Sequence, residues 1–189
     1  MLAVPGEDNS QFYEWIKPML LDKQSREMFG MPAQYMFKDI PDTPRQEDYI
    51  AYTLAQMDKH NIERAMIGVG KFGDTHAEAL RRHPDRFFGS YEANPNQGMD
   101  EVRTIVALHE EFGIKAVTAA PAMICPPVPV NDKKWYPIYA KLVELDIPFC
   151  PCMGVPGPRV PMGPQKMELL DEGLWFFPEL RVVTRHGCE

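Results

Sequence analysis

The stretch RVVTRHGCE, at residues 181–189, joins a short apolar run to the triplet Arg185-His186-Gly187. The β-branched residues of RVVT are typical of a buried strand. His186 would therefore stand at the end of a strand, where α/β proteins usually place their functional side chains. This stretch predicts the last of a series of strand–helix units, with a functional His at its end.

Apolar runs alternate with amphipathic stretches along the rest of the chain. Short apolar runs predict strands, and apolar residues that recur every three or four positions predict helices. The predicted strands, counting a first one at residues 1–4, are 65–69, 87–91, 114–118, 147–152 and 181–184. The predicted helices are 9–21, 44–60, 74–82, 99–112, 135–145 and 165–171. Alternation of this kind indicates a parallel sheet in an α/β fold.

Two features favour a (β/α)8 TIM barrel over an open doubly wound sheet. No G-x-G-x-x-G or Walker-type loop is present. Long loops at 118–134 and 152–164 follow predicted strands, as do the loops that build the active face of a barrel. Because a barrel usually needs about 250 residues, residues 1–189 are expected to form one partial barrel domain with about six of its eight units. We expect its open edges to cause aggregation or oligomerisation.

The composition excludes several classes of partner. Of the 189 residues, 44% are apolar and 25% are charged, as in an ordinary globular domain. The net charge of -7 argues against nucleic-acid and anionic-membrane partners. No apolar run approaches the ~18 residues that span a membrane. The four cysteines lack zinc-motif spacing and no secretory signal is evident, so we expect reduced thiols and a cytoplasmic location.

Five segments, in order, resemble the amidohydrolase-related family, which includes the aminocarboxymuconate-semialdehyde decarboxylase-like enzymes. They are MDKHNIERAMIGV (57–69), HPDRFFGSYEANP (83–95), EEFGIKAVTAA (110–120), WYPIYAKLVELDIPFCPCMG (135–154) and FPELRVVTRHGC (177–188). EEFGIKAVTAA resembles the family's fourth strand. WYPIYAKLVELDIPFCPCMG resembles a helix and the fifth strand that follows it, and FPELRVVTRHGC resembles the sixth strand. The resemblance covers residues 48–189 and implies a (β/α)8 barrel.

The resemblance also implies a divalent metal, usually Zn²⁺, at the carboxyl mouth of the barrel. In the family its ligands are an H-x-H on strand one, a His on strand five and an Asp on strand eight, and a strand-six His acts on the metal-bound water. His186 matches the strand-six His, whereas Cys152 stands at the strand-five His. No residue matches the H-x-H, since no His precedes His60. Either the metal site has been lost or rebuilt, or further ligands lie outside this sequence.

Five residues are candidates for the site, each with a structural alternative. His186 would be a general acid or base and a metal neighbour, or else a His bonded to a loop carbonyl. Cys152 would be a Zn²⁺ ligand or reactive thiol, or else an inert buried Cys. Arg159 would bind a substrate carboxylate, or else be a solvated loop residue. Glu92 and Asn94 would line the mouth and bind substrate, or else cap a loop.

These assignments predict a hydrolase or decarboxylase that acts on a small carboxylate-bearing substrate, with His186 as acid or base. The alternative is a non-catalytic, metal-free barrel that binds a ligand or a partner subunit. A homo-oligomer is expected in either case. The remaining histidines lie on or beside predicted helices and are interpreted as surface residues: His60, His76, His83 and His109.

Overall fold

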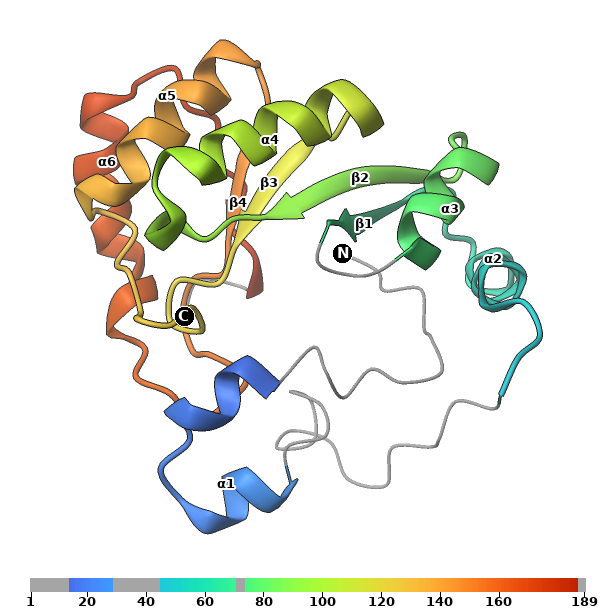
Figure 1. Cartoon of the computed structure of the whole chain (residues 1–189), viewed down its shortest axis with the longest axis horizontal. Coiled ribbons are helices and arrows are strands. Elements are labelled where there is room, and N and C mark those ends of the chain that lie inside the picture. Colours follow the sequence, from blue (N-terminus) through green and yellow to red (C-terminus); the bar gives the residue numbers. More distant parts are fainter. Residues whose placement is uncertain (1–13, 29–44, 71–73, 187–189) are drawn as a thin grey trace.

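A parallel four-stranded sheet forms the centre of the computed structural model, which describes residues 14–28, 45–70 and 74–186 (Figure 1). The strands lie in chain order: β1 Ala65–Val69, β2 Phe87–Glu92, β3 Ala116–Ala119 and β4 Phe149–Pro151. Each strand thus pairs with the next one along the chain, as in a barrel, and the order never reverses as it would in a doubly wound sheet. The strand predicted at 1–4 lies outside the described residues.

The predicted last strand is reduced to two isolated bridges beside β4. Val182 bridges Phe149, and Arg185 bridges Cys152, both in parallel orientation. The Val183 N–H donates to the Phe149 carbonyl at 2.9 Å. The segment therefore continues the sheet at the position predicted for it, although it forms no regular strand.

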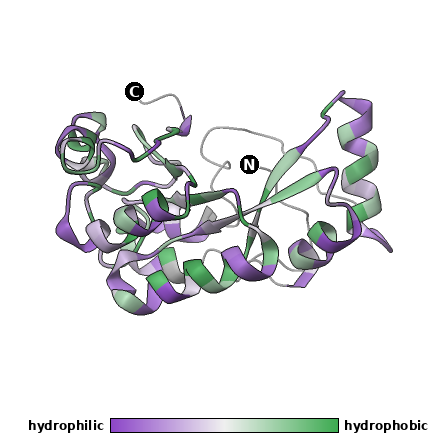
Figure 2. Ribbon diagram, turned by 90° about the horizontal axis from the view of Figure 1, so that it is seen from above, coloured by the Kyte–Doolittle hydropathy of each residue, from purple (hydrophilic) through white to green (hydrophobic). Residues whose placement is uncertain are grey.

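Helices connect the strands. The α-helices are α1 Lys23–Met28, α2 Tyr49–Lys59, α3 Asp74–Arg82, α4 Met99–Phe112, α5 Tyr136–Glu144 and α6 Leu170–Phe176. Short 3-10 helices are η2 Glu14–Met19, η4 Pro95–Gln97, η5 Lys133–Trp135, η6 Gly163–Gln165 and η7 Met167–Leu169. Helix α3 packs on β1 and β2, and α4 packs on β2 and α5. Figure 2 shows mixed hydrophobic and hydrophilic faces along these helices, as expected of an outer layer.

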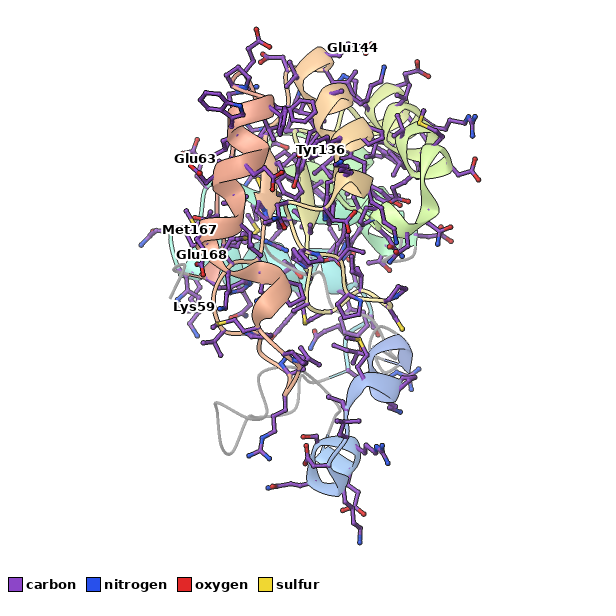
Figure 3. All side chains as sticks on the ribbon, turned by 90° about the vertical axis from the view of Figure 1, so that its left-hand side faces the viewer. Lys59, Glu63, Tyr136, Glu144, Met167 and Glu168 are labelled. Atoms are coloured by element: carbon purple, nitrogen blue, oxygen red, sulfur yellow. The ribbon has the colours of Figure 1, made fainter. Side chains whose placement is uncertain are left out.

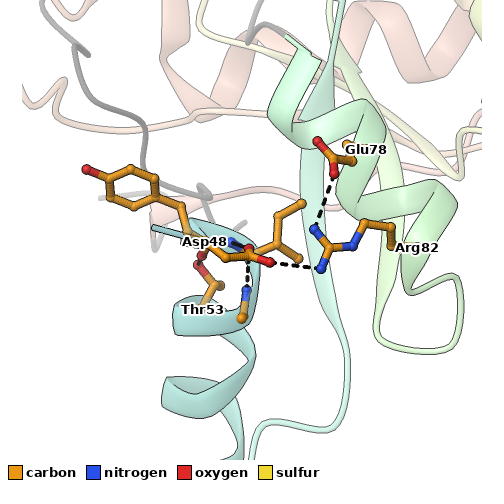
Figure 4. Close-up of polar contacts among 7 residues, drawn as sticks. Asp48, Thr53, Glu78 and Arg82 are labelled. Atoms are coloured by element: carbon orange, nitrogen blue, oxygen red, sulfur yellow. Dashed lines mark hydrogen bonds and ion pairs between the residues drawn. The ribbon is translucent and has the colours of Figure 1, made fainter. Parts of the chain in front are cut away.

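Helix α2 begins at Tyr49, five residues later than the start predicted from Pro44. Asp48 decides this boundary, because its carboxylate accepts hydrogen bonds from the backbone N–H groups of Ile50 and Ala51 at 2.8 and 2.9 Å. The same carboxylate pairs with Arg82 of α3 at 2.9 Å, so the cap also joins two neighbouring helices (Figure 4).

Replacing Asp48 with alanine is expected to lower the free energy of unfolding by about 1 kcal/mol at neutral pH. The bonds from Ala51 and Arg82 hold the pKa of Asp48 below 3.8. Because the folded-state pKa is the lower one, this stabilisation is complete above pH 3.8 and is lost as the pH falls through the lowered pKa. Urea denaturation of both proteins over this range measures the difference. Asp48→Asn retains the cap, and an Asn variant as unstable as the Ala variant would contradict this explanation.

The last helix was predicted at 165–171, and this prediction is wrong at both ends. The chain makes two 3-10 turns and then forms α6 at Leu170–Phe176. Lys166 has extended backbone angles, φ -69° and ψ 138°, which separate the two turns. Gln165 is buried, and its amide donates to the Gly154 carbonyl at 2.8 Å. This bond holds together the two arms of the loop after β4, a tertiary constraint that helix periodicity does not register.

The described N-terminal segment packs on the loops that follow β3 and β4. The helix predicted at 9–21 is a 3-10 helix in its described part, consistent with Pro18 inside it. Ile16 and Leu20 are buried and contact Met123 and Val160, one residue from each of these loops. This segment therefore covers part of the carboxyl side of the sheet.

The centre of the core is a group of aromatic side chains between α5, β4 and α6. Trp135 stacks on Tyr139 with ring centroids 6.1 Å apart, and it meets Phe149 at 5.3 Å. Tyr136 lies between α5 and α6, where its ring meets Phe177 edge-on at 5.2 Å (Figure 3). This group fixes β4 against the helices and so positions the site that follows β4.

Candidate active site at the carboxyl ends of the strands

The strand register brings a row of polar and thiol side chains to one face of the sheet. Glu92 pairs with Thr118, and Thr118 pairs with Cys150. Cys152 lies one pleat beyond Cys150, and its bridge to Arg185 extends the row to the last segment. Gly89, on the opposite face of β2, contacts the helix layer, since a Cβ there would lie 3.3 Å from Leu80. The row therefore faces away from the helices, as the interior of a barrel does.

Arg185 lies at the centre of this row. Its Nη2 lies 3.0 Å from the Cys152 sulfur, 3.2 Å from the Ala119 carbonyl oxygen and 4.0 Å from a Glu92 carboxylate oxygen. Its side chain is only 15% exposed, and that of Glu92 is 17% exposed. The Arg185 N–H also donates to the Pro151 carbonyl at 2.9 Å. The guanidinium thus joins the ends of β2, β3 and β4.

Cys150, in β4, and Cys152, just after it, are buried and carry free thiols. Burial raises the pKa of Cys150, and it raises the pKa of Cys152 as well. The positive charge of Arg185 opposes both increases in pKa. The Glu92 carboxylate raises the pKa of Cys152 further. Cys152 is therefore a neutral thiol at physiological pH.

His186 follows Arg185 directly, and its side chain is exposed. Its backbone has φ 69°, in the left-handed region that non-glycine residues seldom adopt. Partial desolvation and the charge of Arg185 lower the pKa of His186 below 6.5. The imidazole is therefore unprotonated at neutral pH, which is the form that can accept a proton.

Asn94 and Arg159 make their contacts in loops. The Asn94 side chain caps η4 by accepting from the Asn96 N–H at 3.1 Å. Arg159 is exposed and pairs with Asp22 at 3.7 Å, which ties the loop after β4 to the N-terminal segment. The roles of Asn94 and Arg159 in substrate binding stay predictions, as do those of the other candidates. Glu92 and Cys152 are brought together with Arg185, and His186 is its neighbour in sequence.

Three polar residues, one largely buried and two fully buried, were missed from the sequence. Arg185 was passed over because the register that pairs it with Cys152 is not readable without the sheet. His76 was interpreted as a surface residue, which is wrong, since it is 3% exposed and its Nδ1 lies 2.5 Å from the Gly68 carbonyl oxygen. Ala79 and Leu80 are also buried, so spacing of three and four residues along α3 was an available signal.

Glu101, the third missed residue, fixes the loop that follows Glu92 at the end of β2. It is 3% exposed, and its carboxylate accepts the Asn94 N–H at 2.5 Å. Burial and the negative charge of Glu101 raise the pKa of Tyr91, its other hydrogen-bond partner. The signal for Glu101 was its position four residues before buried Ile105 on α4.

Replacing Glu101 with alanine is expected to lower the free energy of unfolding by about 2 kcal/mol, because a buried N–H and a buried hydroxyl lose their acceptor. Thermal and urea denaturation measure the loss. Glu101→Gln retains an acceptor oxygen and is expected to lose less. Glu110 is exposed on the same helix, so Glu110→Ala is the matched control. Equal losses at positions 101 and 110 would contradict the buried network.

The described residues do not fit a divalent metal at this place. Within residues 14–28, 45–70 and 74–186, no three His, Cys, Asp or Glu side chains are grouped so that they could hold a metal ion. A metal bound to Cys152 would have to displace the proton of its thiol, which burial and Glu92 favour. A dication about 4 Å from the Arg185 guanidinium would be repelled by about 8 kcal/mol at an effective dielectric constant of about 20. The predicted ligands Cys152 and His186 thus share their surroundings with a fixed cation.

Comparison with solved structures shows the fold. A TIM-barrel protein from Bordetella bronchiseptica is 22% identical with a TM-score of 0.58, over 71% of this chain and 50% of that chain. A 2,6-dihydroxybenzoate decarboxylase from Rhizobium is 14% identical with a TM-score of 0.59, over 82% and 62%. A 5-carboxyvanillate decarboxylase from Novosphingobium aromaticivorans, solved with bound manganese, is 18% identical with a TM-score of 0.59, over 92% and 60%. These likenesses confirm the barrel-type fold.

The chain spans between 50% and 62% of the length of these three structures. A search of curated proteins found no match. Among the described residues, no helix is both long and apolar enough to cross a bilayer. The sequence model of the amidohydrolase family matches residues 24–188, which include every strand described above, and this chain belongs to that family.

Proposed function

We propose that this chain acts as an amidohydrolase-type hydrolase or decarboxylase on a small carboxylate-bearing molecule. The observation that carries the proposal is the largely buried guanidinium of Arg185 at the strand ends, with His186 next to it in sequence. An Arg fork is suited to a substrate carboxylate. The names of the two decarboxylases with similar folds also specify carboxylated aromatic substrates.

In this proposal His186 moves the proton. In hydrolysis its neutral imidazole takes a proton from the attacking water, and it returns that proton to the leaving group. In decarboxylation the ring first takes up a proton from water, and it gives that proton to the substrate carbon as the bond to the carboxylate breaks and CO2 leaves. Both steps need the reacting group of the substrate to be held beside the His186 ring. Glu92, Asn94 and Arg159 are the further candidates for substrate binding.

A panel of small carboxylates tests the activity. The full chain is incubated with 2,6-dihydroxybenzoate, 5-carboxyvanillate and a set of lactones and amides that carry a carboxylate, and CO2 release and ring opening are measured. We expect turnover of at least one compound. Binding without turnover across the whole panel would contradict the catalytic proposal.

The second candidate function is a non-catalytic module that binds a small carboxylate. It is favoured by Cys152, which stands at the strand-five position where the family has a His, and by its hydrogen bond from Arg185. Saturable binding of a panel member without any product would support this function. Product formation that saturates at the same ligand concentration would exclude it.

We do not propose a Zn²⁺ ion bound by Cys152 and His186, because the Arg185 guanidinium would repel it.

We propose a homo-oligomer, because the side chains of Trp175 and Phe176 on α6 are 81% and 57% exposed. We propose the cytoplasm, because the described cysteines are free thiols. Light scattering on a size-exclusion column tests the assembly, and a monodisperse monomer would contradict it.

A further inference from the structure

We propose that the Arg185 guanidinium replaces the divalent metal as the cationic centre of the mouth and binds the substrate carboxylate without any metal. The proposal rests on the proposed function for the chemical class of the ligand. The location of the binding group and the absence of a metal are argued from the surroundings of Arg185, as given by its contacts with the ends of β2, β3 and β4.

The position of Arg185 is the first argument. Its Nη2 lies 3.0 Å from the sulfur of Cys152, the residue at the family's strand-five metal position. The guanidinium therefore lies where a metal bound to residue 152 would lie. A metal and this guanidinium cannot both occupy that space, because both would contact the same sulfur from the same side of the sheet.

The burial of Arg185 is the second argument. Arg181 lies four residues earlier in the same segment, where it is 57% exposed and pairs with Asp146 at 2.9 Å. Arg185 is 15% exposed and contacts the ends of three strands. An Arg with so little exposure is uncommon, and its partial burial costs desolvation. Its backbone is also fixed, since the Arg185 carbonyl accepts the Met153 N–H at 3.3 Å. The fold thus holds this one cation at the mouth.

The chemistry of the guanidinium is the third argument. Arg stays protonated at every physiological pH and presents five N–H donors in a planar fork that matches a carboxylate. The guanidinium therefore offers an anion a positive charge that does not depend on a metal, and Glu92 is the described carboxylate that pairs with it.

Binding measurements on the full chain test the proposal. The probe is 2,6-dihydroxybenzoate, and resorcinol is its matched control without the carboxylate. By calorimetry we expect equal affinity in EDTA and in MnCl2, with no binding of resorcinol. Arg185→Gln is expected to weaken binding by about 10- to 100-fold, as for loss of a charge-assisted hydrogen bond. Arg185→Lys is expected to retain part of the affinity that Arg185→Gln loses. Arg181→Gln is the matched control and is expected to bind as tightly as the unchanged chain. Circular dichroism confirms that each variant folds.

Binding that requires MnCl2, or that survives Arg185→Gln unchanged, would overturn the inference while leaving the proposed function intact. A second measurement does not depend on the ligand. The alkylation rate of Cys152 by iodoacetamide is followed by peptide mass spectrometry with and without ZnCl2, with exposed Cys125 as the internal reference. We expect no selective protection of Cys152. Protection by Zn²⁺ would overturn the inference, and absence of all carboxylate binding would contradict the proposed function and the inference together.

Discussion

Replacing Trp135 with alanine is expected to lower the free energy of unfolding by about 3–5 kcal/mol. Trp135 is 0% exposed, stacks on Tyr139 and meets Phe149 of β4. Its indole N–H also donates to the Val128 carbonyl at 3.4 Å. Removing the ring leaves a cavity between α5 and the sheet and an unpaired buried carbonyl. Urea denaturation followed by circular dichroism measures the loss.

Trp175 is the matched control for this substitution, since it is the same residue type at 81% exposure on α6. Trp175→Ala is expected to change stability by no more than about 0.5 kcal/mol. Similar losses in the two variants would contradict the assignment of the core. The comparison bears on the site too, because Phe149 belongs to the strand that carries Cys150 and leads to Cys152.

Local pattern was sufficient where a helix or strand is decided by its own residues. The bounds predicted for β1, α3 and α4 agree with those of the structure, because apolar spacing and a terminal glycine mark their ends. Gly113 takes φ 58°, the left-handed conformation that ends α4. The family resemblance added the barrel, and the sequential strand order agrees with it.

Pattern failed where distant contacts decide. Side-chain bonds from Gln165 hold the loop after β4 and displace the start of α6, and nothing in residues 163–170 reveals this. The centre of the site depends on register, because the bridge between Cys152 and Arg185 brings the guanidinium to the thiol. A sequence can mark Cys152 and His186 as strand-end residues, but the charge that surrounds them comes from three strands at once.

Replacing His186 with asparagine is expected to lower kcat by about 100- to 10,000-fold for whichever panel carboxylate is turned over, the usual contribution of a general acid or base. KM is expected to change little, because the proposal assigns carboxylate binding to Arg185. Steady-state kinetics of the two proteins measure both quantities. His60→Asn, at the exposed carboxyl end of α2, is the matched control and is expected to retain full activity.

The pH profile separates a proton-transfer role from a structural one. A general base works when neutral, and desolvation and Arg185 lower the pKa of His186 below 6.5. For hydrolysis, the acid limb of kcat/KM is therefore expected below pH 6.5, with activity lost as the pH falls through the lowered pKa. Arg185→Gln removes one cause of the shift, so it should move this limb upward. A limb that stays in place in Arg185→Gln, or full kcat in His186→Asn, would show that another group transfers the proton.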